Sequence, residues 1–259
     1  MNTRQLLNVI TLLGVVIING LANALPFNGI TTGEISDSFP VLFTPAGYVF
    51  SIWGLIYLLL LGFAIYQALP SQRNNPRLER IGYWFVISNL FNAAWIFLWH
   101  YGYFPLTLLA MLGLLGSLIV IYQRLQIGLT RVRFPQNLFE NLPFSVYLGW
   151  ISVATVANFS IALYDLGWNG FGIAPQVWTV IVLAVAAGIG AAMLLLRRDF
   201  AFAFVLIWAF AGITVKQIET PVVAIAASIA AIILLIVLLF QFIRRQLVPD
   251  NLAQLQEPA

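Results

Sequence analysis

The chain has 259 residues, of which 61% are hydrophobic and only 8% are charged. Soluble globular proteins carry about 25% charged residues, so this composition argues against a soluble enzyme, a nucleic-acid-binding domain and a disordered chain. The net charge of +3 does not indicate a nucleic-acid partner, because the basic residues lie between long apolar runs. The composition predicts an all-α integral membrane protein surrounded by the lipid bilayer.

Eight apolar segments have the composition of membrane-spanning helices. A helix needs about 20 mostly apolar residues to cross a bilayer. In chain order the segments are 5–25, 46–69, 81–100, 104–124, 142–164, 175–196, 200–215 and 220–243. The seventh is short and needs flanking residues to complete a crossing.

The basic residues of the connecting segments give an orientation. With eight crossings, eleven of the twelve basic residues fall on one side of the membrane, and Lys216 alone falls on the other. The positive-inside rule then places both termini in the cytoplasm. We expect a multi-pass protein of the bacterial inner membrane.

The first apolar segment has a second interpretation. Arg4, the apolar run and Ala22-Asn23-Ala24 are also typical of a secretory signal peptide with a small-residue cleavage site. Cleavage would leave seven spans with the new N-terminus outside.

Small residues recur along the sixth span. Ala184, Gly188 and Ala192 follow one another at intervals of four residues. Small residues let membrane helices approach closely, so this stripe predicts packing against another helix, with self-association of two chains as the alternative.

The predicted spans contain no clear Asp or Glu, which disfavours a carboxylate-driven pump. The chain has no cysteine, and no catalytic or metal-binding group of residues is recognisable. The lone histidine, His100, is interpreted as an interfacial residue, with a tetrapyrrole or metal contact as the alternative. Lys216 is interpreted as an interfacial lysine, which could pair with Glu219, rather than as the anchor of a retinal Schiff base.

Several aromatic and polar residues share helix faces inside the spans. Residues three or four apart lie on the same face of a helix, and Trp53 and Tyr57 are four residues apart. The same spacing rule groups Asn92 with Trp95, and Trp150 with Ala154 and Asn158. An intramembrane Asn is costly unless it is hydrogen-bonded, so these faces point to protein or to a cavity. Spacing alone favours a packed core with interhelical hydrogen bonds, and a pocket for a flat apolar ligand is the alternative.

Three of these segments resemble motifs of the TspO/MBR family, the tryptophan-rich sensory proteins or translocator proteins (peripheral benzodiazepine receptors). Residues 43–57 read FTPAGYVFSIWGLIY and resemble the start of the family's second helix. Residues 89–95, NLFNAAW, resemble its L-x-x-N-x-x-W element in the third helix. Residues 147–158, YLGWISVATVAN, resemble its Y-L-A-W-x-x-[FA]-A-T-x-L-N element in the fifth helix. The resemblance covers about residues 5–165.

The resemblance implies a five-helix bundle, often dimeric, that binds a porphyrin or another apolar molecule. It implies that Trp53 and Trp150 are aromatic walls of the pocket and that Ala154 is a small wall residue. The remaining implied ligand-binding residues are Tyr57, Asn92, Trp95 and Asn158. Pro40, Phe43 and Pro45 would belong to a loop that covers the mouth of the pocket as a lid.

The sequence also departs from the family pattern. The second-helix motif is one residue shorter between Phe50 and Trp53, and Tyr48 stands where the family often has Trp. No basic residue follows Asn158-Phe159 at the end of the fifth span, so sterol binding is not carried over. Three further helices have no counterpart in the five-helix pattern. We therefore divide the chain into a TspO-like bundle (1–165), an added three-helix segment (166–245) and a polar tail (246–259).

The resulting functional hypothesis is a sensor, carrier or scavenger of a tetrapyrrole or similar apolar molecule. It requires no cofactor, although a porphyrin or haem-type molecule would be the ligand. A small-molecule transporter or permease is the alternative, and a porphyrin-degrading enzyme is a weaker one because no acid, base or metal group supports it.

Overall fold

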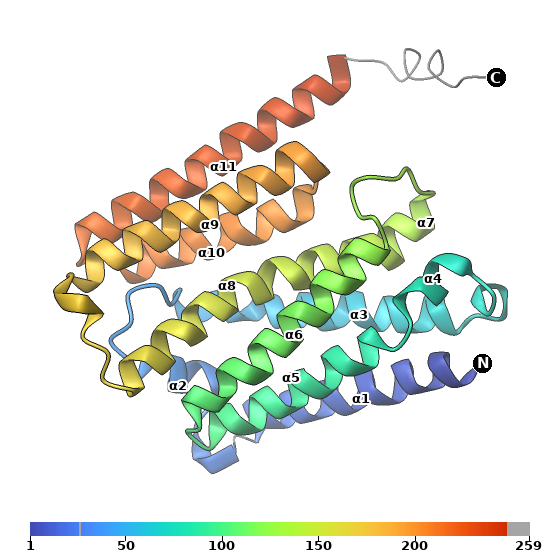
Figure 1. The fold of residues 1–259 in the computed structure, drawn as a ribbon, viewed down its shortest axis with the longest axis horizontal. Helices are drawn as coiled ribbons and strands as arrows, with labels where there is room; N and C mark the ends of the chain where they lie inside the picture. The colour runs from blue at the N-terminus through green and yellow to red at the C-terminus, as the bar shows by residue number, and fades with distance from the viewer. Residues whose placement is uncertain (26, 248–259) are drawn as a thin grey trace.

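The computed structural model describes residues 1–25 and 27–247, and within them all regular secondary structure is helical. The long helices are α1 (Thr3–Ala24), α3 (Ile52–Ala68), α5 (Trp84–His100), α6 (Phe104–Arg124), α8 (Leu142–Asp165), α9 (Pro175–Arg197), α10 (Phe200–Lys216) and α11 (Pro221–Leu247) (Figure 1). Each of them overlaps one of the eight predicted spans. The predicted tail from residue 248 onward lies outside the described residues.

Short helical elements lie in the connections. They are η1 (Phe27–Gly29), α2 (Thr32–Asp37), η2 (Gly47–Ser51), η3 (Pro70–Gln72), α4 (Pro76–Ile81), α7 (Phe134–Gln136), η4 (Asn137–Asn141) and η5 (Gly170–Gly172). Because η2 precedes α3 and α4 precedes α5, the second and third long helices begin later than the apolar segments that predict them.

Local sequence signals fix the helix ends. Asn2 caps α1, with Gln5 completing a reciprocal capping box. Gly82 has a φ of 61°, which ends α4 and delays the start of α5 to Trp84. Arg198 takes the left-handed conformation after α9, and the Asp199 side chain then accepts a hydrogen bond from the Phe202 amide to start α10. These contacts make the connection between α9 and α10 a tight turn.

Six helical segments have the length and apolar composition needed to cross a membrane, and they contain α1, α3, α6, α8, α9 and α11. The other two long helices, α5 and α10, have 17 residues each. The chain is therefore an all-α, multi-pass membrane protein. The crossing of the membrane by all eight helices stays a prediction.

The N-terminal helices form one bundle, and the C-terminal helices pack on its side. α5 lies between α1 and α6, α6 packs on α8, and α3 packs on α1 and α8 (Figure 1). α9, α10 and α11 contact one another, and α10 also contacts α8. Gly149 makes this contact close, because a Cβ atom built there would lie 3.1 Å from Cβ of Val205.

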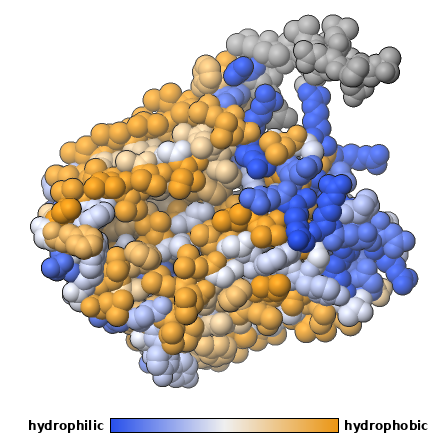
Figure 2. Space-filling model, viewed as in Figure 1, coloured by the Kyte–Doolittle hydropathy of each residue, from blue (hydrophilic) through white to orange (hydrophobic). Residues whose placement is uncertain are grey.

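The two ends of the bundle differ in charge. The N-terminus, α4 and α7 lie at one end, which we call the Arg-rich end (Arg73, Arg77, Arg80, Arg131, Arg133). α2 and the connection from α8 to α9 lie at the opposite end, which we call the acidic end (Glu34, Asp37, Asp165, Glu219). Figure 2 shows the hydrophilic residues gathered at the Arg-rich end and a largely hydrophobic surface along the helices.

The small-residue stripe of the sixth span does not pack within the chain. Ala184, Gly188 and Ala192 are exposed, and a Cβ atom added at Gly188 would have no neighbour within 4 Å. α9 packs instead through the face that contains Gly190, where an added Cβ would lie 2.9 Å from Leu206. The predicted packing through this stripe is therefore wrong for a single chain. The spacing of the residues shows that they share a helix face, but it does not show whether that face meets another helix or the outside of the bundle.

Candidate functional site

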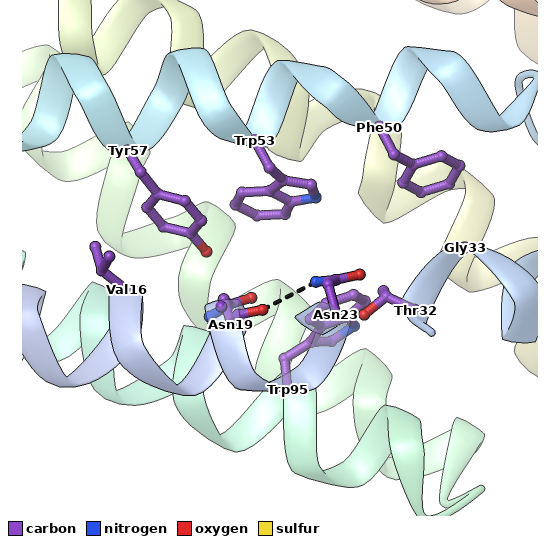
Figure 3. A pocket seen from close by; sticks show the side chains of 10 residues that line it. Val16, Asn19, Asn23, Thr32, Gly33, Phe50, Trp53, Tyr57 and Trp95 are labelled. Atoms are coloured by element: carbon purple, nitrogen blue, oxygen red, sulfur yellow. Dashed lines mark hydrogen bonds between the residues drawn. The ribbon is translucent and has the colours of Figure 1, made fainter. Parts of the chain in front are cut away.

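A cavity of about 320 Å³ lies inside the bundle between α1, α3 and α5, with α2 at one end (Figure 3). Its walls combine aromatic, amide and small side chains. The lining residues are Val16, Asn19, Gly20, Asn23, Thr32, Gly33, Phe50, Trp53, Tyr57 and Trp95. Three of the seven predicted ligand-binding residues, Trp53, Tyr57 and Trp95, therefore line one cavity.

The aromatic wall belongs mainly to α3. The rings of Trp53 and Tyr57 are stacked, with centroids 5.5 Å apart and planes inclined by 20°. Trp150 of α8 meets Trp53 edge to face at 6.2 Å and is only 2% exposed. Trp150 does not line the cavity, so it supports the wall residue Trp53 from behind.

Amide side chains form a polar patch opposite this wall. Asn19 of α1 donates a 2.8 Å hydrogen bond to the Asn92 side-chain oxygen, and Asn92 donates one of 2.7 Å to the Tyr147 hydroxyl. Asn92 is fully buried and does not line the cavity itself, but it is hydrogen-bonded to Asn19, which does. The Tyr57 hydroxyl is buried near Asn92 but completes no hydrogen bond among the described residues. Figure 3 shows this hydroxyl directed from α3 toward α1, where a ligand atom could pair with it.

Asn158 positions an aromatic residue and does not line the cavity. Its side-chain oxygen accepts a 2.9 Å hydrogen bond from Nε1 of Trp95, and its amide nitrogen donates one of 2.6 Å to the Thr107 hydroxyl. This arrangement ties α5, α6 and α8 together behind the Trp95 ring. Ala154 is partly buried in the core and is not among the lining residues.

The three predicted lid residues lie away from the cavity. Pro40 is exposed, whereas Phe43 and Pro45 are buried. Pro45 packs on Gly212 of α10, and the neighbouring Ala46 amide donates a 3.1 Å hydrogen bond to the Gly212 carbonyl. The same connection does reach the cavity, but it does so through α2. The lining residues from α2 are Thr32 and Gly33.

Contacts at both ends hold α2 in place. The Thr32 hydroxyl lies 3.1 Å from Nε2 of His100, and the Thr32 carbonyl accepts a 3.2 Å hydrogen bond from Trp99. At the other end, Nζ of Lys216 lies 2.5 Å from Asp37 and 3.0 Å from the Thr44 hydroxyl. The partner of Lys216 is therefore Asp37 and not Glu219.

His100 is buried and has a contact at each ring nitrogen. Nε2 faces the Thr32 hydroxyl, and Nδ1 lies 3.3 Å from the Phe27 carbonyl. These contacts tie the end of α5 to α2 and to the segment that precedes it.

α1 contributes a wall that was not among the predicted site residues. Val16, Asn19, Gly20 and Asn23 stand at positions i, i+3, i+4 and i+7 and so share one face. Asn19 and Asn23 carried the signal, because an amide inside an apolar span indicates a protein-facing or cavity-facing side. A chain cleaved after Ala24 would lack this wall.

The comparisons with known proteins give one match. The model of a family described as TSPO-like protein matches residues 5–240. The match extends past residue 165 and takes in α9, α10 and most of α11, so the three C-terminal helices lie within the region that the family model describes. No curated protein and no solved structure matches the chain.

Proposed function

Because the chain belongs to the family of TSPO-like proteins, we propose that it binds a tetrapyrrole such as a porphyrin, or a similar flat apolar molecule, within the membrane. The site is the cavity between α1, α3 and α5. The observation that carries the proposal is the pairing of a stacked aromatic wall, Trp53 and Tyr57, with the Asn19 and Asn92 amides opposite. Ligand sites typically combine apolar walls with a few such polar groups.

The size of the cavity limits how a ligand would lie. Small-molecule sites usually have volumes of about 300–1,000 Å³, so a cavity of about 320 Å³ is at the lower end of that range. A flat ring inserted between Trp53 and α1 would stack on the indole, and the rest of a tetrapyrrole would extend into the mouth beside Thr32. The proposed role is that of a sensor, carrier or scavenger, which needs binding but no chemical step.

Transport is a second candidate, supported by polar side chains along α1. Gln5 and Asn8 are buried between the cavity and the Arg-rich end, and Gln5 donates a 2.6 Å hydrogen bond to the Gln67 carbonyl. The side-chain oxygens of Asn8 and Asn89 are buried and lack partners among the described residues. Such groups suit water or a polar solute moving along this face. Uptake of a labelled porphyrin by proteoliposomes separates transport from binding alone.

Filling the cavity is the sharpest test of the binding site. Gly20 lines the cavity, and a Cβ atom added there meets nothing within 4 Å, so Gly20→Leu places its side chain in the open space. We expect porphyrin affinity, followed by the absorbance of the bound ring, to fall at least tenfold. Gly14→Leu is the matched control, because Gly14 is in the same helix with equal room and does not line the cavity.

The aromatic wall is tested separately. In a Trp53→Phe, Trp150→Phe double variant the wall loses indole area and its edge-to-face support. Aromatic contacts contribute about 0.5–1.5 kcal/mol each, so affinity should fall about tenfold. Trp178→Phe serves as the control, since Trp178 lies at the start of α9 and bonds the Gly170 carbonyl. Unchanged affinity in both Gly20→Leu and the double variant would remove this cavity as the site.

A further inference from the structure

A second cavity, of about 500 Å³, lies beside α2 at the acidic end. α2 contributes Thr32 and Gly33 to the first cavity and Glu34 and Ile35 to the second. Aromatic rings and oxygen-bearing side chains dominate the lining of the second cavity. The lining residues include the polar Asn28, Glu34 and Ser38 and the aromatic Phe39, Trp99 and Phe104. The proposed porphyrin site uses none of them.

The aromatic rings of this cavity are set at right angles to one another. Phe39 meets Phe104 at 4.8 Å with planes inclined by 81°, and Trp99 meets Phe104 at 5.4 Å and 84°. Trp99 is buried and stacked on Trp95, so the rings of this cluster that can meet a guest are the partly exposed Phe39 and Phe104. The face of an aromatic ring carries a negative potential and attracts cations.

The polar groups of the cavity offer oxygen acceptors. The Ser38 hydroxyl donates to the Ile35 carbonyl at 2.7 Å, and the Asn28 amide nitrogen donates to the His100 carbonyl at 2.8 Å. Their oxygens remain as acceptors toward a guest. One Glu34 oxygen accepts from the Thr31 amide at 2.7 Å and from its hydroxyl at 2.8 Å. These two hydrogen bonds lower the pKa of Glu34 below its usual value of 4.5, so the carboxylate is ionised at neutral pH.

The charge around the cavity favours a cation as well. Of the four carboxylates at the acidic end, Asp37 is paired with Lys216, the one lysine of the chain. Among the lining residues in the described part of the chain, Glu34 is the one with a formal charge at neutral pH when His100 is neutral. The Glu34 side chain is exposed to solvent, so its carboxylate attracts cations from solution toward the aromatic lining.

We infer that this second cavity binds an organic cation, a small amine or quaternary ammonium group, between Glu34 and the rings of Phe39 and Phe104. The carboxylate supplies the charge and the rings surround the alkyl groups. A guest without charge would gain nothing from the Glu34 carboxylate, and an anion would meet it as a like charge.

The second site is separated from the first by a bonded wall. Thr32 of α2 contacts both His100 and Trp99, and Trp99 is stacked on Trp95 with ring centroids 5.3 Å apart. Trp95 faces the first cavity and Trp99 faces the second. A change that fills the first cavity should therefore leave the second intact.

The test uses choline and its uncharged isostere 3,3-dimethylbutan-1-ol as probes. The full-length protein is purified in a maltoside detergent, which has no ammonium headgroup, and binding is followed by ligand-observed NMR. We expect saturable binding of choline and at least tenfold weaker binding of the isostere. Glu34→Gln should weaken choline binding about tenfold. Gln also completes a capping box with Thr31, so this variant keeps the start of α2.

Controls separate a built site from general surface charge. Asp165→Asn removes a carboxylate from the same end without touching the cavity, and it should leave choline affinity unchanged. Phe39→Leu should weaken binding at least threefold. Equal binding of the two probes, or equal losses in Glu34→Gln and Asp165→Asn, would overturn the proposal.

The Gly20→Leu variant distinguishes this proposal from the proposed porphyrin site. Choline binding should persist in it while porphyrin binding is lost. If choline binding is lost as well, choline occupies the first cavity and the inference is wrong. Comparing nanodiscs of phosphatidylcholine and phosphatidylglycerol then identifies the source of the cation. At an ionic strength that screens the surface charge of phosphatidylglycerol, weaker choline binding in phosphatidylcholine means that the lipid headgroup competes for the site, and equal binding indicates a free amine.

Discussion

The intramembrane Asn residues of this protein serve mainly to hold aromatic residues in place. Asn92 and Asn158 each use both the oxygen and the nitrogen of the side chain, and each joins different helices. The sequence left open whether the Trp and Asn residues formed a pocket or a packed core. The structure contains both arrangements: Trp53 and Trp95 line a cavity, whereas Trp150 and the two amides support it from the core.

The spacing of residues could not separate cavity-lining residues from core residues, because it shows that residues share a helix face but not what that face contacts. Trp150, Ala154 and Asn158 do share a face, yet none of them lines the cavity. On α1, by contrast, Asn19 and Asn23 had the spacing and the residue type of a cavity wall. Like Asn92, they are amides inside an apolar span, so this part of the site was predictable from the sequence.

Replacing Asn158 with Leu tests its positioning role. The change leaves the Trp95 indole N–H without its partner in a buried place, and a buried unpaired donor costs about 1–3 kcal/mol. We expect a loss of stability of that size in reversible unfolding from mixed micelles. Asn23→Leu is the matched control, because the Asn23 amide bonds only the Asn19 carbonyl of its own helix and is exposed. Equal losses in the two variants would contradict the role given to Asn158.

At the scale of the element, helix ends were easier to predict than the short helices between them. α9 begins at Pro175 and α11 at Pro221, as proline at the first helical position predicts. α2 has only six residues and no apolar periodicity, although Thr31 and Glu34 form its capping box. Tertiary contacts from His100 and Lys216 hold it. His100 is 68 residues from Thr32 and Lys216 is 179 residues from Asp37 along the chain, so local sequence patterns could not reveal these contacts.

Gly128 provides a test of how the C-terminal helices dock. It has a φ of +79°, and a Cβ atom added there would lie 1.8 Å from the Arg197 carbonyl oxygen at the end of α9. Gly167 also has a positive φ, +69°, but has nothing within 4 Å. Gly167→Ala should cost only the backbone strain, about 1–2 kcal/mol. Gly128→Ala should cost clearly more, because the loop and α9 must also separate.

Thermal unfolding of the two variants in detergent measures this difference. A lower melting temperature for Gly128→Ala than for Gly167→Ala is the expected order. Similar melting temperatures would mean that the contact between the 125–133 connection and α9 adds little to stability.

At the scale of the whole molecule, the fold class and the positions of the long helices were predictable, but their arrangement was not. Lipid-facing and protein-facing surfaces are both apolar in a membrane helix, so hydrophobicity alone does not show which face of a helix packs against the protein. The outward-facing stripe of Ala184, Gly188 and Ala192 is the clearest example. The position of α10 on α8 depends instead on close approach at Gly149, where an added Cβ would lie 3.3 Å from the Phe202 carbonyl oxygen.

The number of crossings is the remaining question at this scale, and it rests on α5 and α10, the two long helices that lie outside the six segments long enough to cross. At 1.5 Å per residue, α5 and α10 are about 25 Å long, shorter than the hydrocarbon core of about 30 Å. Each must use flanking residues or local thinning of the bilayer to cross. The separation of charge supports a crossing, since Arg73, Arg77 and Arg80 precede α5 at the Arg-rich end and His100 ends it beside α2.

Single-cysteine labelling tests the crossings, and the absence of native cysteine makes the chain suited to it. Ser71 and Ala174 are exposed and lie in connections separated by α5, α6 and α8. Three crossings put them on opposite sides of the membrane. A membrane-impermeant maleimide should label Ala174→Cys in intact cells and label Ser71→Cys only after permeabilisation, as expected if the Arg-rich end faces the cytoplasm. The reverse pattern would invert the topology, and labelling from one side only would show that one of the three helices, most simply α5, does not cross.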